Sequence, residues 1–203
     1  MKVPSYPELA ALRVSNAQPW FTNAWDLNLV ILRSGYVGRW DDLVVVATVD
    51  DAGREIVYPV ACTADAWPGE WVNPTNPSGC VYILDGHYPG GFSLGEHKGR
   101  PALRQVRPFD CVRWPATLRT VPTVEELEAV AQSSRFSAIC GTHLHSCYTS
   151  RSTAEPPPDS SEGCVVSLHR HEHAGLVELV RQQGRHAGGV TVSPTFHTWS
   201  SSA

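Results

Sequence analysis

The alternation of apolar runs with turn residues predicts a chain built mostly of short β-strands. The strongest run is Leu43–Val49, in which β-branched residues dominate. Asp50-Asp51-Ala52-Gly53 then supplies turn residues, which predicts a hairpin with the run that follows. Apolar runs typical of strands lie at residues 25–32, 43–49, 54–61, 80–84, 102–106, 111–114, 136–145 and 189–195. We therefore expect a mostly β fold of the sandwich or barrel-like kind.

Two segments instead show helical spacing. Thr123-Val124-Glu125-Glu126 matches a capping box, and apolar residues then recur on one face. A second short helix is expected over residues 172–183, with Gly184 placed to end it. Gly-, Pro- or Ser-rich stretches predict loops and turns at residues 67–79, 86–95 and 150–161.

Composition narrows the function classes. The chain has 203 residues, with 16 Lys plus Arg against 20 Asp plus Glu and a net charge of −4. This balance argues against binding nucleic acid or an anionic membrane through bulk charge. No stretch approaches the roughly 18 apolar residues of a membrane-spanning helix. The length suits a single domain over residues 1–203, in which residues 1–60 either join the same sheet or form a separate docking part.

Cysteines are scattered along the chain. The six cysteines are too sparse for a small disulfide scaffold, so most are expected to be small buried hydrophobic residues.

Residues 1–7 lack the apolar core of a secretory signal. The protein is therefore expected to be made in the cytoplasm and either to act there or to leave by another route.

Candidate chemistry gathers around two histidines and one cysteine. On a strand, His143 and His145 would point to the same face. Cys164 follows Gly163 at the end of a polar loop, where a thiol meets little side-chain crowding. A nucleophilic thiol needs thiolate character, which a nearby imidazole supplies. The Gly163 and Cys164 amides could line an oxyanion pocket. These residues alone allow a Cys–His nucleophile, but a buried cysteine with packing histidines is the more common arrangement.

The sequence around His145 and Cys164 resembles that of a known enzyme family. His145, fifteen intervening residues and Ser161-Glu162-Gly163-Cys164 resemble the active-site motif of L,D-transpeptidase (YkuD-type) catalytic domains. The similarity is greatest to small phage and bacterial members, and it spans residues 25–196. The matching elements are Gly95-Glu96-His97-Lys98-Gly99, Ala102-Leu103-Arg104-Gln105, Gly141–His145 and Ser161–Cys164.

This resemblance implies roles for individual residues. Cys164 would be the nucleophile, His145 its base, and Ser161 and Gly163 would shape the nucleophile loop. His97 and His143 would lie at the cleft as substrate-binding residues. In the family, the thiolate attacks the carbonyl of a diamino-acid residue in a peptidoglycan stem peptide and forms a thioester. An amine then completes a cross-link, or water completes a cleavage. A preformed thiolate–imidazolium pair would serve this attack.

The resemblance also implies context. No cofactor is expected. The partners would be peptidoglycan stem peptides and proteins of a phage tail or injection particle. Because peptidoglycan lies outside the cytoplasm, a virion-borne or lysis-released wall enzyme fits a chain without an export signal.

Three positions depart from the family pattern. Glu162 stands where a histidine usually precedes the Gly-Cys pair, and Val166 stands where an arginine commonly follows the cysteine. His145 is followed by Ser146 rather than glycine. The nucleophile and base survive these changes, but substrate recognition does not carry over. Glu162 is also expected to raise the pKa of the Cys164 thiol.

Two other function classes remain open. The departures are compatible with a non-catalytic structural component of a phage particle in which the site has decayed. A zinc site is the third possibility, because several candidate ligands occur close together in the sequence. Those ligands are Cys140, His143, His145, Cys147, Cys164, His169, His171 and His173. The alternating histidines from 169 to 173 lack the i, i+4 spacing of helical zinc ligands, which favours simple solvation at a helix start.

Overall fold

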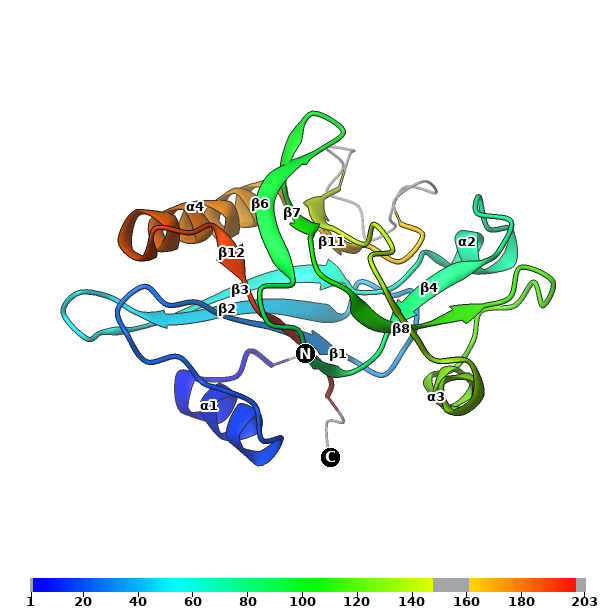
Figure 1. The fold of residues 1–203 in the computed structure, drawn as a ribbon, viewed down its shortest axis with the longest axis horizontal. Helices are drawn as coiled ribbons and strands as arrows, with labels where there is room; N and C mark the ends of the chain where they lie inside the picture. The colour runs from blue at the N-terminus through cyan, green and yellow to red at the C-terminus, as the bar shows by residue number, and fades with distance from the viewer. Residues whose placement is uncertain (1, 148–160, 200–203) are drawn as a thin grey trace.

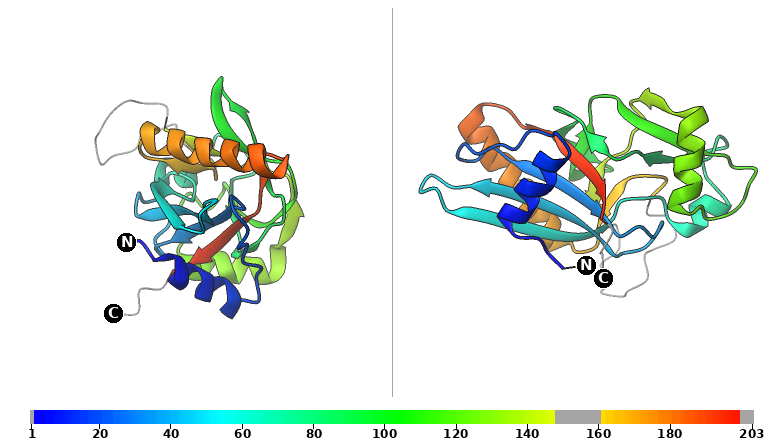
Figure 2. Two further views of the ribbon diagram at one scale, coloured as in Figure 1. Left: turned by 90° about the vertical axis from the view of Figure 1, so that its left-hand side faces the viewer. Right: turned by 90° about the horizontal axis from the view of Figure 1, so that it is seen from below.

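The computed structural model describes residues 2–147 and 161–199. In these residues thirteen strands form two sheets and four helices pack around them (Figures 1 and 2). The mostly β, sandwich or barrel-like prediction is thereby confirmed. The predicted loop at residues 150–161 lies outside the described residues except for Ser161.

The larger sheet curls through most of the molecule. Its strands are β1 (Asn28–Arg33), β2 (Asp42–Val49), β3 (Glu55–Thr63), β5 (Gly86–His87), β6 (Phe92–His97), β7 (Arg100–Gln105), β10 (Leu144–Ser146), β11 (Val165–Ser167), β12 (Thr191–Val192) and β13 (Pro194–Thr198). Their spatial order is β12-β6-β7-β10-β11-β3-β2-β1-β13-β5. The strands of residues 1–60 therefore lie inside this sheet.

The smaller sheet packs against one end of the larger. It contains β4 (Cys80–Ile83), β8 (Phe109–Trp114) and β9 (Phe136–Ala138), with β8 in the middle. Val81, Ile83, Phe109 and Cys111 from this sheet join the same buried core as β1, β2 and α4 (Arg170–Ala187). One continuous core thus fixes the two sheets relative to each other.

The central strands are apolar on both faces because each face is covered. Leu29 and Ile31 of β1 enter the main core, whereas Val30 and Leu32 pack in a second cluster with Leu9 of α1 (Tyr6–Ser15). Successive residues of a strand point to opposite faces, so both sets are buried at once. This explains the unbroken apolar run of β2 as well.

Both predicted helices form, with one corrected end. Thr123 Oγ1 accepts the Glu126 N–H at 3.2 Å and the Thr123 N–H donates to the Glu126 carboxylate at 2.8 Å, so α3 (Val124–Ser134) has its capping box. The second helix, α4, continues past Gly184 to Ala187. Gly188 ends it in the left-handed conformation, with φ 71°. Gly184 instead leaves room for Val190, which a Cβ would approach to 2.8 Å.

Two further helices depart from the prediction. Helix α1 begins after Ser5, whose N–H donates to Glu8 at 2.6 Å; this is a second capping-box pattern. The short helix α2 (Pro68–Val72) falls inside a predicted loop, where Trp71 anchors it in a buried cluster. No helix in the described ranges is long and apolar enough to cross a bilayer.

Two strand predictions and one turn prediction also need correction. The expected strand over residues 136–145 is two strands in different sheets, β9 and β10, separated by a loop in which Gly141 has φ 74°. The expected Gly-rich turn over residues 86–95 contains β5 and most of β6. Gly91 there serves close packing, since a Cβ would lie 2.4 Å from the Phe109 ring. The final run, 189–195, likewise divides into β12 and β13.

Candidate active site

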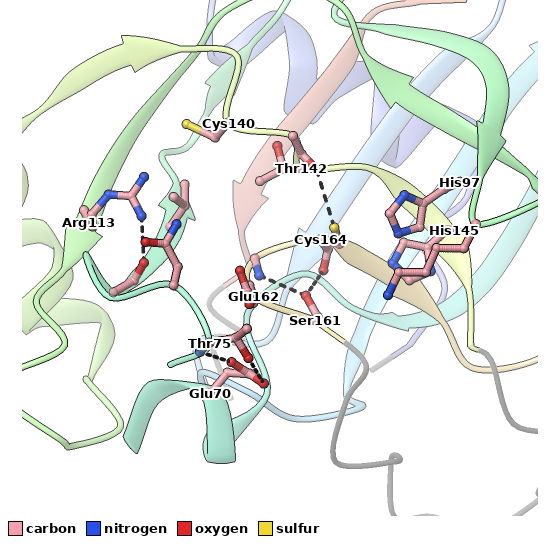
Figure 3. Close-up of a pocket in the computed structure, with 16 residues that line it drawn as sticks. Glu70, Thr75, His97, Arg113, Cys140, Thr142, His145, Ser161, Glu162 and Cys164 are labelled. Atoms are coloured by element: carbon pink, nitrogen blue, oxygen red, sulfur yellow. Dashed lines mark hydrogen bonds between the residues drawn. The ribbon is translucent and has the colours of Figure 1, made fainter. Parts of the chain in front are cut away.

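A cavity of about 430 Å³ lies where the two sheets meet, and Cys164 lies in it (Figure 3). Residues of β4 and β8 line one side, and the ends of β6 and β10 line the other. The rest of the lining comes from α2 and the loop after it, from Lys98, from residues 140–142 and from residues 161–164. The site is therefore assembled from segments that are distant in the sequence.

Strand pairing brings His145 beside the cysteine. Strands β10 and β11 are parallel neighbours, with Leu144 opposite Val165 and His145 opposite Val166. Cys164 immediately precedes β11, and the His143 N–H points at its sulfur with N···Sγ 3.4 Å. Cys164 and His145 line the same cavity. The structure thus places the predicted nucleophile and base in one site.

The loop before Cys164 is held by Ser161 and by contact with β4. The Ser161 hydroxyl donates to the Cys164 carbonyl at 2.8 Å and accepts the Gly163 N–H at 3.0 Å. Gly163 has φ 134°, and a Cβ on it would lie 2.5 Å from the Val81 carbonyl oxygen. Only glycine fits this contact. The Gly163 N–H expected to face an oxyanion is thus engaged by Ser161 instead.

Three imidazoles cluster on one side of the thiol. The His97 ring centroid lies 4.8 Å from that of His145 and 4.9 Å from that of His143. His145 Nδ1 lies 3.0 Å from the Ser146 carbonyl oxygen, which can only accept, so Nδ1 carries the proton and Nε2 is the basic nitrogen. His143 Nδ1 accepts the Gln105 N–H at 3.2 Å. Among the predicted residues, His97 and His145 line the cavity, whereas His143 contributes its backbone N–H.

The thiol and its base are both neutral at pH 7. Burial raises the pKa of the Cys164 thiol to about 11; the His143 N–H and Lys98 oppose this effect and Glu162 adds to it, as expected. Burial likewise lowers the pKa of His145 to about 4. These pKa values disfavour the preformed thiolate–imidazolium pair that the family resemblance suggests. The proton must leave the thiol during the attack.

Gln105 organises the loop of residues 140–142, which lines the cavity. Its side-chain oxygen accepts the Cys140 N–H at 2.9 Å and the Thr142 hydroxyl at 3.0 Å, and its amide nitrogen donates to the carbonyls of Arg107 and Ala138 at 3.0 Å each. Gln105 is 4% exposed. It belongs to the quoted Ala-Leu-Arg-Gln element, but the sequence assigned it no role because all of these partners except Arg107 are distant in the chain.

The other cysteines divide by environment. All six are free, and Cys62, Cys80, Cys111 and Cys147 are buried, which confirms the expectation for most of them. Cys140 is half-buried at the cavity edge. A hydrogen bond with the Cys111 thiol lowers the pKa of Cys140 to about 7. The site therefore contains a second thiol that is more acidic than Cys164.

The candidate zinc ligands lie in different environments. His173 is buried, with Nδ1 3.1 Å from the Ser167 hydroxyl and Nε2 3.0 Å from the Pro101 carbonyl oxygen, so both ring nitrogens are used. His169 and His171 stack on each other at the start of α4, with centroids 5.6 Å apart. Within residues 2–147 and 161–199, no three His, Cys, Asp or Glu side chains are grouped to hold a metal ion.

Comparisons of the chain with protein-family models, with curated proteins and with solved structures found no match. The similarity to L,D-transpeptidases therefore remains a prediction that depends on the quoted motifs. What the site can do must be judged from its own groups: a half-buried thiol, a basic imidazole nitrogen on the neighbouring strand, and charged side chains around one cavity.

Proposed function

We propose that this protein is a peptidoglycan-modifying enzyme that forms a thioester between Cys164 and a stem peptide. The observation that carries the proposal is that Cys164 and His145 line one cavity, with Cys164 directly before β11 and His145 on the parallel neighbour β10. A thiol next to an oriented imidazole is the arrangement that nucleophilic acyl transfer requires. The motifs around these residues resemble those of L,D-transpeptidases, and this resemblance is the reason for proposing a stem peptide as the acyl donor.

The proposed reaction has two steps. The Cys164 sulfur attacks the carbonyl of the donor residue while His145 Nε2 takes the thiol proton. The carbonyl re-forms, the bond to the terminal D-amino acid breaks, and His145 returns the proton to the departing amine. An acceptor amine or water then attacks the thioester and regenerates the thiol. The first acceptor gives a cross-link, and the second gives a carboxypeptidase or endopeptidase.

The neutral resting pair supports general-base catalysis for the first step. With a thiol pKa of about 11 and a His145 pKa of about 4, proton transfer is uphill before substrate binds. The His143 N–H, which faces the sulfur at 3.4 Å, stabilises the thiolate as it develops.

The enzyme is proposed to act on the cell wall as a virion-borne or lysis-released protein, with phage-particle proteins as partners.

A non-catalytic phage-particle component is the second candidate. The raised pKa of Cys164 and the engaged Gly163 N–H favour it, because both weaken the chemistry of the site. The two candidates differ in one measurable respect: a structural component forms no adduct on Cys164.

Mass spectrometry of defined muropeptides incubated with the protein tests the proposal. We expect loss of a terminal D-amino acid or a cross-linked dimer, with an acyl adduct on Cys164. Cys164→Ala should abolish both, and His145→Ala should lower turnover roughly 10²- to 10⁴-fold. His171→Ala, on an exposed histidine of α4, is the matched control. Absence of turnover and of adduct in the wild type would refute the enzyme and leave the structural candidate.

A further inference from the structure

Two cysteines that the thioester chemistry does not use lie next to each other at one edge of the cavity. Cys140 is half-buried and lines the cavity, whereas Cys111 of β8 is fully buried. A hydrogen bond joins their two thiols. In the close-up of the site, the Cys140 sulfur points away from Cys164 (Figure 3). The pair is therefore a separate group of sulfur atoms, one member of which lines the cavity.

The fold holds Cys140 against β8. Strand β9 pairs with β8, with Phe109 opposite Ala138, and Cys140 lies just beyond the end of β9. The Cys140 N–H donates to the Gln105 side chain at 2.9 Å, and the Cys140 side chain packs against the core cluster that contains Cys111. Strand pairing and a buried glutamine thus bring together two thiols that are far apart in the sequence.

The surroundings of the two thiols give them different roles. The hydrogen bond from Cys111 and the charge of Arg113 lower the pKa of Cys140 to about 7, although burial opposes them. The hydrogen bond with Cys140 and burial raise the pKa of Cys111 far above its ordinary value. The single Cys111 proton can be donated to the Cys140 sulfur or to the Phe109 carbonyl oxygen at 3.3 Å. A substantial share of Cys140 is therefore thiolate at pH 7, and the thiolate is the form that oxidants attack.

We infer that Cys140 and Cys111 form a redox-active dithiol, which hydroperoxides oxidise to a disulfide that links the loop of residues 140–142 to β8. Cys140 is the thiol that meets the oxidant, because it lines the cavity, and buried Cys111 is the thiol that resolves the product. A disulfide constrains the segment between its two cysteines, which here contains α3 and β9. Oxidation would thus close one wall of the cavity covalently. The inference does not depend on the chemistry of Cys164.

The reaction proceeds in two steps with hydrogen peroxide as the oxidant. The Cys140 sulfur attacks one peroxide oxygen, the O–O bond breaks, and Cys140 becomes a sulfenic acid while one water is released. The Cys111 sulfur then attacks the Cys140 sulfur, the S–O bond breaks, and the hydroxyl group leaves with the Cys111 proton as a second water. Two thiols are oxidised to one disulfide, and one peroxide is reduced to two waters.

Peptide mapping by mass spectrometry after treatment with hydrogen peroxide at pH 7 tests the inference. We expect a Cys111–Cys140 cross-linked peptide that dithiothreitol separates. Cys111→Ala removes the resolving thiol, so the sulfenic acid should persist on Cys140 and react with dimedone. Arg113→Gln should slow the oxidation of Cys140 roughly two- to fivefold, because the thiolate fraction at pH 7 falls as the pKa rises. The oxidised wild type should also unfold at a higher urea concentration than the reduced protein.

Matched controls are Cys80→Ala, which removes a buried thiol from β4 of the same sheet, and Arg54→Gln, on a side chain 81% exposed in the β2–β3 hairpin. Both should form the disulfide at the wild-type rate. A Cys140–Cys164 cross-link, or a wild-type Cys140 that is oxidised to sulfinic acid without cross-linking, overturns the inference. Equal urea midpoints for the oxidised and reduced wild type overturn the closure of the cavity wall. The wild-type map decides the question even if Cys111→Ala does not fold.

Discussion

At the scale of single residues, the two thiols that line the cavity have pKa values shifted in opposite directions. Cys164 is desolvated, which raises its pKa to about 11, whereas the hydrogen bond between Cys140 and Cys111 lowers the pKa of Cys140 to about 7. Reactivity toward alkylating agents follows the thiolate. The most acidic thiol of the cavity is therefore not the one that the motif marks as the nucleophile.

We expect iodoacetamide to modify Cys140 first at pH 7. The Cys164 rate should rise about tenfold per pH unit between pH 7 and pH 9.5, because the thiolate fraction grows in that proportion below its pKa. Peptide mass spectrometry over this pH range measures both rates, with fully buried Cys62 as an internal control that stays unlabelled. A Cys164 rate that is constant from pH 6 to pH 9 would instead indicate a preformed thiolate–imidazolium pair.

At the scale of elements, some strands and helices are predictable from their own residues, whereas others depend on contacts with distant parts of the chain. Strand β2 and helix α3 follow from their own residues, through β-branched composition and a capping box. Helix α1 carries the same local signal in Ser5 and Glu8, and it was predictable by the same reasoning. The break between β9 and β10 was not, because Gln105 imposes it from a distant strand.

Gln105→Leu tests this control of the loop. Leucine has a similar size but leaves the N–H groups of Cys140 and Thr142 without their acceptor, at a cost of about 1–3 kcal/mol for each buried group. We expect urea denaturation to show lower stability, and kcat to fall more than KM changes, because the His143 N–H loses its position against the thiol.

The matched control is Gln132→Leu, on the exposed side of α3. A positioning role also predicts that Gln105→Leu alters the pH dependence of Cys164 alkylation, which a loss of stability alone does not explain. An unchanged alkylation profile in a destabilised Gln105→Leu protein would reduce Gln105 to a structural residue.

At the scale of the whole molecule, the candidate site depends on two sheets staying together. One sequence motif was enough to predict four residues of the site, Cys164, His145, Ser161 and Gly163. Arg113 was not predictable from the sequence, since β8 reaches the cavity only through the packing of the smaller sheet on the larger. The strand order of the larger sheet is equally non-local, because β10 and β11 insert between β7 and β3.

One buried cation connects the sheets. Arg33 of β1 is 2% exposed and pairs with buried Asp65 at 3.2 Å and with exposed Asp85 at 3.1 Å. Its guanidinium carbon lies 4.3 Å from the centroid of the Tyr82 ring in β4. It also lies 4.9 Å from the Phe196 ring centroid of β13. Breaking a buried ion pair from one side leaves the other charge without compensation.

Arg33→Met should therefore destabilise the fold by about 3–5 kcal/mol, measured by chemical denaturation. The double variant Arg33→Met with Asp65→Leu removes both charges of the buried pair and leaves only the exposed Asp85 without its partner, so it should recover much of that loss. Arg54→Gln, whose ion pair with Asp50 involves an exposed side chain, should cost less than about 1 kcal/mol. If the double variant is as unstable as Arg33→Met, the contribution of Arg33 is packing on Tyr82 and Phe196 rather than charge. In both outcomes, the wall of the cavity that contains Arg113 should be disrupted first, because that wall belongs to the smaller sheet.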